Sequence, residues 1–306
     1  MSVAEDSARW IAATAHAARA NDEGRVIAIV GPTASGKTEL ALALADALGG
    51  EIVNADSVQI YERFDIGSGK PTTEELARVP HHLIGVLAPL AAIDAARFAE
   101  VALQTVDAVR ARGRVPIVCG GTFLWQKALF FGLAEAPAPS PEIRARHREL
   151  ADAEGRSALH RRLAAVDPSS AHRLHPNDFV RVSRALEIFE QTGERQSDAH
   201  KRHAFKASRL TPAFMAITVT PEELTARVER RVISFLSRGL VEEVRSLLAD
   251  GFGDARAMGA VGYKETRAHL AGDLPERDLP AAIVRATRIY ARRQRTWLNH
   301  VDVTYV

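Results

Sequence analysis

A phosphate-binding loop between a strand and a helix is the feature that most constrains the fold of this chain. The residues Gly-Pro-Thr-Ala-Ser-Gly-Lys-Thr at 31–38 follow an apolar run at 26–30 and precede a helix-like run at 39–48. The pattern G-x-x-x-x-G-K-[ST] in this context is typical of a P-loop, whose glycines let backbone N–H groups turn toward an anion. The helix N-terminus and Lys37 would add positive charge, and the Thr38 hydroxyl would add a ligand for Mg²⁺. The sequence therefore predicts a site for a phosphate compound, formed by Gly31, Pro32, Thr33, Ala34, Ser35, Gly36, Lys37 and Thr38.

Alternating strand-like and helix-like segments predict an α/β fold. Apolar runs at 26–30, 51–55, 115–119 and 214–219 are separated by helical segments, of which 94–112 is clearly amphipathic. This alternation is typical of a parallel sheet that binds ligands at the carboxyl ends of its strands. We therefore expect a P-loop NTPase-like parallel sheet flanked by helices, with the turns after the strands converging on one site.

A change in composition divides the chain. The proline-rich segment 136–141 resembles a linker, charged helical stretches follow it, and the polar segment 193–209 has no clear periodicity. Apolar strand character then returns at 214. The predicted organisation is an N-terminal extension at 1–24, an α/β core with a helical C-terminal part at 25–133 and 210–306, and a helical insertion at 134–209.

Positive charge is concentrated in two segments, although the net charge of the chain is only +2. Residues 141–210 hold 14 lysines and arginines against 10 acidic residues, and residues 281–300 hold arginines and no acidic residue. Two basic segments in a chain with a phosphate loop favour a nucleic-acid partner, with a solvated helix face as the alternative for either segment. No apolar run approaches the length of a membrane span. The single cysteine, Cys119, fits a reducing cytosol and a place in the core.

Polar residues follow the strands at the positions where a ligand would lie. Asp56 comes directly after the second strand and could act as a general base or hold Mg²⁺, with a helix or turn cap as the alternative. The strand at 115–119 ends in Gly-Gly-Thr at 120–122 instead of the Walker B carboxylate of an ATPase, which argues against hydrolysis by an activated water. Arg227 and Arg231 share a helix face, from which one or both could reach a phosphate; solvent exposure is the alternative.

Several short motifs together resemble the tRNA dimethylallyltransferases, a family of prenyltransferases. They occur in order between about residues 26 and 298, and their spacing is more specific than any one of them. Besides the P-loop they are NADSVQIY at 54–61, DIGSGKP at 65–71, PHHL at 80–83, GGT at 120–122, HPND at 175–178, VGYK at 261–264 and RRQRTW at 292–297. The chain departs from the family pattern at Gly85, Phe123, Trp125 and Gly259, where Asp, Gly, Tyr and Gln are common.

The resemblance implies transfer of a dimethylallyl group from dimethylallyl diphosphate to N6 of the adenosine immediately 3′ of a tRNA anticodon, with release of diphosphate. The P-loop would hold the diphosphate with Mg²⁺ on Thr38, and the insertion at 134–209 would bind tRNA. The catalytic residues implied are Lys37, Asp56 as the base, Thr122 and Arg227. The residues implied at the tRNA are Asp56, Ser57, Val58, Gln59, Thr122, Arg144, Val180, Arg181, Val182, Ser183, Arg184, Gly259, Ala260, Val261, Gly262, Tyr263 and Lys264.

Two other functions share part of this pattern. A small-molecule ATP-dependent kinase would use the P-loop and Asp56 but needs neither basic segment, and a P-loop RNA-binding protein would need no catalytic base. We expect the transferase, acting in the cytoplasm as a monomer on the anticodon stem-loop of tRNA.

Overall fold

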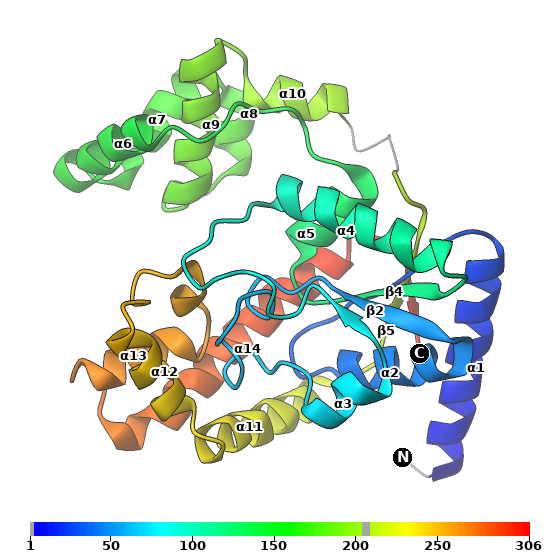
Figure 1. The fold of residues 1–306 in the computed structure, drawn as a ribbon. Helices are drawn as coiled ribbons and strands as arrows, with labels where there is room; N and C mark the ends of the chain where they lie inside the picture. The colour runs from blue at the N-terminus through cyan, green and yellow to red at the C-terminus, as the bar shows by residue number, and fades with distance from the viewer. Residues whose placement is uncertain (1–2, 204–208) are drawn as a thin grey trace. The chain divides into compact units, whose positions relative to one another are not determined.

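A parallel sheet carries the P-loop. In the computed structural model, which describes residues 3–203 and 209–306, this sheet has six strands in the order β3-β2-β4-β1-β5-β6 (Figure 1). Every neighbouring pair is parallel. The strands are β1 (Val26–Ile29), β2 (Gly50–Asn54), β3 (His81–His82), β4 (Val115–Cys119), β5 (Pro212–Ala216) and β6 (Val303–Tyr305). The predicted α/β class is confirmed.

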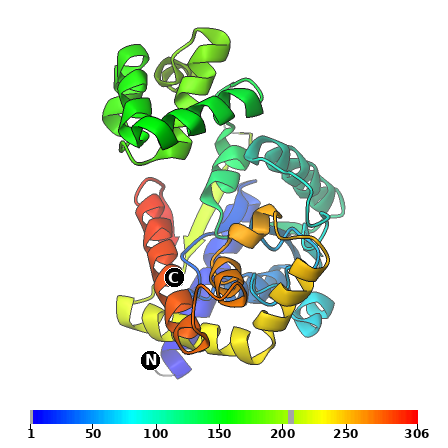
Figure 2. The same cartoon turned by 90° about the vertical axis from the view of Figure 1, so that its left-hand side faces the viewer.

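Helices cover both faces of this sheet and extend beyond its carboxyl edge. The α-helices outside the insertion are α1 (Val3–Asp22), α2 (Lys37–Leu48), α3 (Thr73–Arg78), α4 (Ala95–Ala111), α5 (Phe123–Phe131), α11 (Pro221–Ser237), α12 (Leu240–Ala249), α13 (Tyr263–Leu270) and α14 (Leu279–Leu298). The short 3₁₀ helices η1 (Arg256–Gly259) and η2 (Glu276–Asp278) join the last three. Figure 2 views the side on which α11 to α14 gather.

The alternation of side chains along the strands forms a core on each face of the sheet. Ile27, Ile29 and Ile117 point to one face, where they pack against Leu40 and Leu44 of α2. Because successive strand residues point to opposite faces, the residues between them meet the other layer. There Phe214 of β5 packs edge-to-face on Phe130 of α5.

The strand register brings three loops to one edge of the sheet. Ile29 of β1 pairs with Cys119 of β4, and Cys119 also pairs with Asn54 of β2. Three segments therefore start at the same level of the sheet: the P-loop, the segment that begins at Asp56, and the Gly-Gly-Thr turn. This meets the expectation that the turns converge, although they are far apart in the sequence.

The chain divides into two compact units, Met1–Phe130 with Arg209–Val306, and Phe131–Ser208. The sequence placed the insertion at 134–209. The second unit has its own apolar core, which includes Leu159, Leu163 and Val182. Its helices are α6 (Pro141–Glu154), α7 (Arg156–Val166), α8 (Pro168–Arg173), α9 (Phe179–Thr192) and α10 (Gln196–His203).

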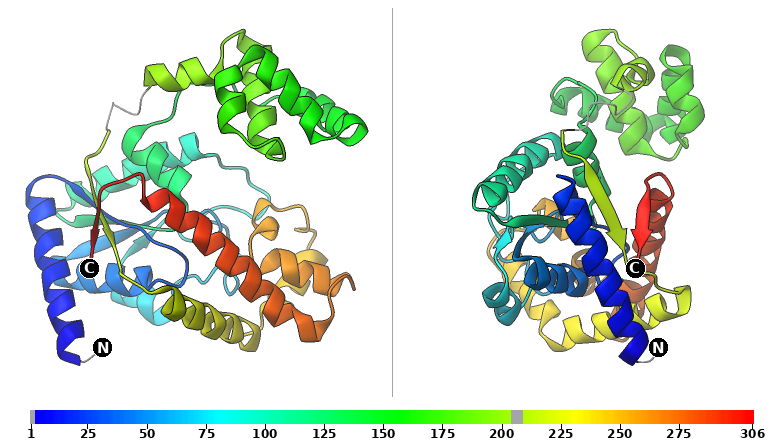
Figure 3. Two further views of the ribbon diagram at one scale, coloured as in Figure 1. Left: turned by 180° about the vertical axis from the view of Figure 1, so that it is seen from behind. Right: turned by 90° about the vertical axis from the view of Figure 1, so that its right-hand side faces the viewer.

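Some elements differ from the sequence-based expectation. The segment 193–209, which lacks periodicity, contains α10, and β5 spans Pro212–Ala216 where a strand was expected at 214–219. The short strands β3 and β6 were not predicted. Beside β6, His16 Nε2 of α1 lies 3.2 Å from Thr304 Oγ1, and Figure 3 shows that helix against the strand. No helix within residues 3–203 and 209–306 combines the length and apolarity that a bilayer span requires.

Candidate active site

A cavity of about 1170 Å³ lies at the carboxyl edge of the sheet. Its walls come from the P-loop, from the loops that follow β2 and β4, and from α11, η1 and α14. Most of the residues predicted for the diphosphate and for the acceptor line this one cavity. They include Thr33, Ala34, Gly36, Lys37, Thr38, Asp56, Ser57, Val58, Gln59, Arg227, Gly259, Ala260, Val261 and Gly262.

The P-loop backbone is wound so that it can cradle an anion. Gly31 and Gly36 have φ angles of 147° and 97°, and Ala34 adopts a left-handed φ of 63°. A Cβ at position 31 would lie 2.8 Å from Ser35 Oγ, so the turn needs glycine there. Ser35 Oγ is buried and has no hydrogen-bond partner within the described part of the chain. Helix α2 begins at Lys37 without a side-chain cap, which leaves its first N–H groups available.

Lys37 is folded back onto its own loop. Its Nζ donates hydrogen bonds to the carbonyl oxygens of Gly31 (3.0 Å) and Pro32 (2.7 Å). Burial lowers the pKa of Lys37 to about 8, against the opposing effect of the nearby Asp56 carboxylate. An anionic ligand would favour the charged amine and raise this pKa again.

Two arginines of α11 face the cavity. Arg227 Nη1 donates to the Ser35 carbonyl (3.1 Å), which brings the predicted arginine to the P-loop. Arg231 Nη2 donates to the Ser68 carbonyl (3.3 Å), and its guanidinium lies 4.6 Å from the centre of the Phe235 ring. Burial lowers the pKa of Arg231, while Asp56 acts in the opposite direction.

Asp56 both shapes its turn and offers a carboxylate to the cavity. Its Oδ1 accepts hydrogen bonds from Val58 N (2.9 Å) and Gln59 N (3.3 Å), and its own N–H donates to Asn54 Oδ1 (3.1 Å). These contacts confirm that Asp56 caps the turn that follows it, which was the alternative interpretation of this residue. They engage one oxygen, so Oδ2 is the atom that could take up a proton.

Thr122 is tied to the residue that follows Asp56. Thr122 Oγ1 accepts from Ser57 N (3.0 Å) and lies 3.1 Å from Ser57 Oγ. Glycine is required at the start of the same turn, because a Cβ at Gly120 would lie 2.2 Å from the Ala55 carbonyl oxygen. Thr122 therefore fixes the backbone beside the candidate base.

Gln294 of α14 is a site residue that the sequence analysis did not single out. It is buried, and its Oε1 accepts from the P-loop amide of Thr33 (2.8 Å) while its Nε2 donates to the Gly121 carbonyl (2.9 Å). One side chain thus joins α14, the P-loop and the turn after β4. Its sequence signal was the glutamine inside the RRQRTW motif.

The segment 259–264, expected at the tRNA, has mixed surroundings. Gly259 to Gly262 line the cavity, and Lys264 is exposed. Tyr263, however, is fully buried, and its hydroxyl donates to Glu243 (2.6 Å). The Tyr263 ring is enclosed by protein, so a contact with RNA at this position would come from its backbone, and the place of the segment at the tRNA stays a prediction.

The residues predicted at tRNA in the second unit also divide into two groups. Val180 is 75% exposed, and Arg181, also on the surface, forms an ion pair with Asp178 (3.3 Å). Val182 and Ser183 are buried, so within this segment the side chains of Val180 and Arg181 are the ones available to RNA, and the predicted contact stays a prediction.

Arg144 and Arg184 converge on a buried carboxylate of the same unit. Glu187 accepts from Arg144 Nε (3.0 Å), from Arg184 Nη1 (2.6 Å) and from Ser140 N (2.6 Å). Burial raises the pKa of Glu187, but these hydrogen bonds outweigh it and hold the pKa below its usual value. Both arginines therefore have a structural partner.

Two features that departed from the expected motif pattern have a packing role. Phe123 stacks on Trp297 with ring centroids 4.3 Å apart, and Trp125 stacks on Phe98 at 4.1 Å. At Gly259 no atom lies within 4 Å of an added Cβ, so the space for a larger residue is open.

Known proteins are similar to this chain in sequence and in fold. Residues 59–301 match the IPP transferase family. A tRNA dimethylallyltransferase of Sorangium cellulosum is 60% identical over 283 residues, covering 92% of this chain and 90% of the relative. The crystal structure of the full-length tRNA isopentenylpyrophosphate transferase from Bacillus halodurans matches with a TM-score of 0.67 and 34% identity, covering 92% of this chain and 89% of that one. A eukaryotic dimethylallyltransferase acting on tRNA matches with a TM-score of 0.74 and 27% identity, covering 92% and 73% of the two chains.

Proposed function

This chain belongs to the IPP transferase family and is a tRNA-prenylating enzyme, and we propose that it uses the cavity at the sheet edge for both substrates. The donor in this proposal is dimethylallyl diphosphate. The acceptor is N6 of the adenosine immediately 3′ of the anticodon, and diphosphate is the product released.

The observation that carries the proposal is the shared cavity. Its lining includes P-loop residues between Thr33 and Thr38 and the carboxylate residue Asp56. An enzyme that joins an allylic diphosphate to a nucleophile needs both groups at one site. The absence of a carboxylate at the end of β4 fits this reaction, because no water has to be activated.

The first requirement is to stabilise the leaving diphosphate. Breaking the C1–O bond of the donor leaves an allylic cation whose charge is delocalised, and negative charge accumulates on the diphosphate. Lys37, Arg227 and the N–H groups at the start of α2 would stabilise that charge electrostatically. Arg227 is already placed against the loop by its hydrogen bond to Ser35.

The second requirement is to bring the adenine amino group to the allylic carbon. An exocyclic amine is a weak nucleophile, so orientation contributes more than basicity. As the C–N bond forms, Asp56 Oδ2 would accept the N6 proton. The target base has to leave the anticodon-loop stack to reach the cavity, as other base-modifying enzymes require.

Mg²⁺ is expected to bind together with the diphosphate. Thr38, whose side chain lines the cavity, is the residue that would hold it, with the diphosphate oxygens as further ligands. Such a small set of protein ligands suits Mg²⁺, which keeps several waters and binds largely through phosphates. The ion would neutralise charge on the leaving group when bound.

The basic residues would bind the polyanionic partner. Arg285, Arg288, Arg292, Arg293 and Arg295 of α14 are exposed, and the second unit adds exposed Arg181. We propose that these surfaces contact the tRNA backbone, and that the enzyme works as a monomer in the cytoplasm, where its tRNA substrate is found.

A transfer assay tests the proposal. The purified protein is incubated with Mg²⁺, radiolabelled dimethylallyl diphosphate and an anticodon stem-loop bearing the target adenosine, and label in the RNA is the expected result. The label should disappear when that adenosine is replaced by guanosine. No label, with ATP consumption in the presence of a small-molecule acceptor, would instead support the kinase.

A further inference from the structure

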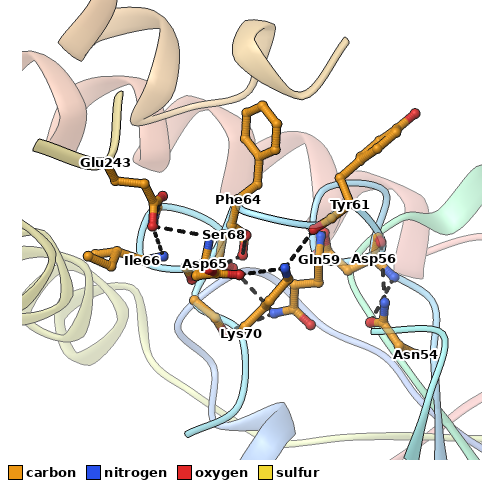
Figure 4. A network of polar contacts seen from close by, with 12 residues as sticks. Asn54, Asp56, Gln59, Tyr61, Phe64, Asp65, Ile66, Ser68, Lys70 and Glu243 are labelled. Atoms are coloured by element: carbon orange, nitrogen blue, oxygen red, sulfur yellow. Dashed lines mark hydrogen bonds and ion pairs between the residues drawn. The ribbon is translucent and has the colours of Figure 1, made fainter. Parts of the chain in front are cut away.

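The loop 65–69 has no role in the mechanism above, although its sequence is one of the motifs of the chain. Glu243 of α12 holds this loop from one side (Figure 4). Four hydrogen bonds of 2.6 to 3.3 Å reach its two carboxylate oxygens, from the backbone N–H groups of Asp65, Ile66 and Gly67 and from the Tyr263 hydroxyl. A carboxylate that accepts this many bonds fixes the course of the backbone.

Close packing holds the same loop in place. A Cβ at Gly67 would lie 2.7 Å from ring carbons of Tyr263, so the backbone rests directly on that ring. Ser68 N donates to the Tyr263 hydroxyl (3.1 Å). Gly69 has a left-handed φ of 64°, and a Cβ there would lie 2.2 Å from Arg231 Nη2. Burial of the Tyr263 phenol, next to Glu243, raises its pKa, which keeps it protonated as a donor.

Gln59 holds the loop from the opposite side. Gln59 Nε2 donates to the carbonyl oxygens of Ser68 (3.2 Å) and Gly69 (2.9 Å). Carbonyl oxygens can pair only with the NH₂ end of an amide, so these two bonds fix which way the amide faces. No residue in the described part of the chain donates to Gln59 Oε1, and Gln59 lines the cavity. The side chain therefore offers one acceptor oxygen, three residues after Asp56.

We propose that Glu243 and Tyr263 are positioning residues, which act through the loop 65–69 to orient the Gln59 amide toward the acceptor base. Neither Glu243 nor Tyr263 is among the described residues that line the cavity. The inference rests on the proposed function, since an acceptor oxygen beside Asp56 suits an amino group such as N6 of adenine and disfavours the carbonyl oxygen of guanine.

Hydrogen exchange tests the structural link without requiring activity. Glu243→Gln places an NH₂ group where one carboxylate oxygen accepted hydrogen bonds, so the loop N–H groups that bonded to that oxygen lose their acceptor. We expect peptides covering 65–69 to exchange at least about tenfold faster in this variant. Glu242→Gln is the matched control, because Glu242 is the adjacent residue on α12 and its exposed carboxylate pairs with Arg245. Equal exchange in the two variants would overturn the proposal.

Kinetics test the link to Gln59. In the transfer assay, Glu243→Gln should lower kcat/KM for the stem-loop about tenfold, and Gln59→Ala should have little further effect in that background. Independent, multiplicative effects of the two substitutions would overturn the proposal, because a general loss of stability does not depend on Gln59. If Glu243→Gln does not fold, Tyr263→Phe gives the same comparison by removing one hydroxyl. An inactive wild-type enzyme would overturn the proposed function instead, whereas the exchange result would still stand for the loop.

Discussion

Lys37 illustrates how burial tunes a single residue. Its amine lies among backbone carbonyls, and its pKa of about 8 is low enough for part of the population to be neutral near physiological pH. A bound diphosphate would raise that pKa. Ligand binding and proton uptake by Lys37 are therefore linked.

Diphosphate affinity should fall as the pH rises through the pKa of Lys37 in the free enzyme. Because the pKa is higher in the complex, binding is strongest below about pH 8 and weakens above it, by up to about tenfold per pH unit. Calorimetric titration with a dimethylallyl diphosphate analogue between pH 7 and 9 measures this. Lys37→Arg should remove the dependence, because arginine stays protonated throughout; a slope retained in that variant would assign the effect to another group.

Asp56→Asn should abolish the proposed proton transfer while preserving the turn. Asparagine retains an oxygen to accept from Val58 N, so the backbone after β2 should keep its course. We expect kcat to fall by a factor of about 10² to 10⁴, with binding of the stem-loop nearly unchanged. Single-turnover transfer and filter binding measure the two effects. Transfer at the wild-type rate would remove Asp56 as the base.

At the scale of elements, helix α14 contributes to the site through its buried residue Gln294. The helix exposes arginines on one side, and on the other Gln294 bonds to the P-loop and to the turn after β4. These loops follow different strands, so the sheet alone does not fix their separation. A single buried amide from a distant helix does so.

Gln294→Met should lower both stability and diphosphate binding. Methionine fills a similar volume but cannot pair with Thr33 N or the Gly121 carbonyl, so unfolding free energy should fall by about 1–3 kcal/mol. Urea denaturation measures this, and KM for the diphosphate should rise in the same variant. Thr296→Ala is the control, since Thr296 is exposed on the same helix. Equal stability of both variants would contradict a bridging role for Gln294.

At the scale of the whole molecule, the proposed contacts of basic residues on both units should give tRNA binding a strong electrostatic component. Arg181 on α9 and the arginines of α14 are exposed. Counterions released from the phosphates would make the affinity depend on salt.

Arg181→Ala should weaken tRNA binding and reduce its salt dependence. The slope of log K against log salt should become smaller by about 0.7 to 1 for each lost phosphate contact. Arg97→Ala is a matched control. Arg97 lies in the other unit, is also exposed, and also forms an ion pair with a residue three positions away, Glu100. Filter binding of the tRNA over a salt series measures both variants, and identical slopes would place Arg181 outside the interface.

Local patterns predicted the parts of the site that depend on neighbouring residues. The P-loop and the position of Asp56 after a strand follow from sequence runs, and the register of β1, β2 and β4 then brings them together. Gln294 and Glu243, whose side chains hydrogen-bond to loops of the site, were not predicted, because they come from helices far along the chain. The buried positions of Tyr263, Val182 and Ser183 also depend on tertiary packing that a motif does not contain.

The position of β5 has a consequence for synthesis of the protein on the ribosome. β1 pairs with β4 on one side and with β5 on the other, yet β5 begins only at Pro212, after the whole second unit has been made. Nascent chains expose one edge of β1 until then, with the P-loop already present and Arg227 and Gln294 still missing. Since folding of a nascent chain proceeds from its N-terminus, we expect the complete ligand site to form only after α14 has been synthesised and docks. A chain released early would contain the phosphate loop without the residues that complete its site.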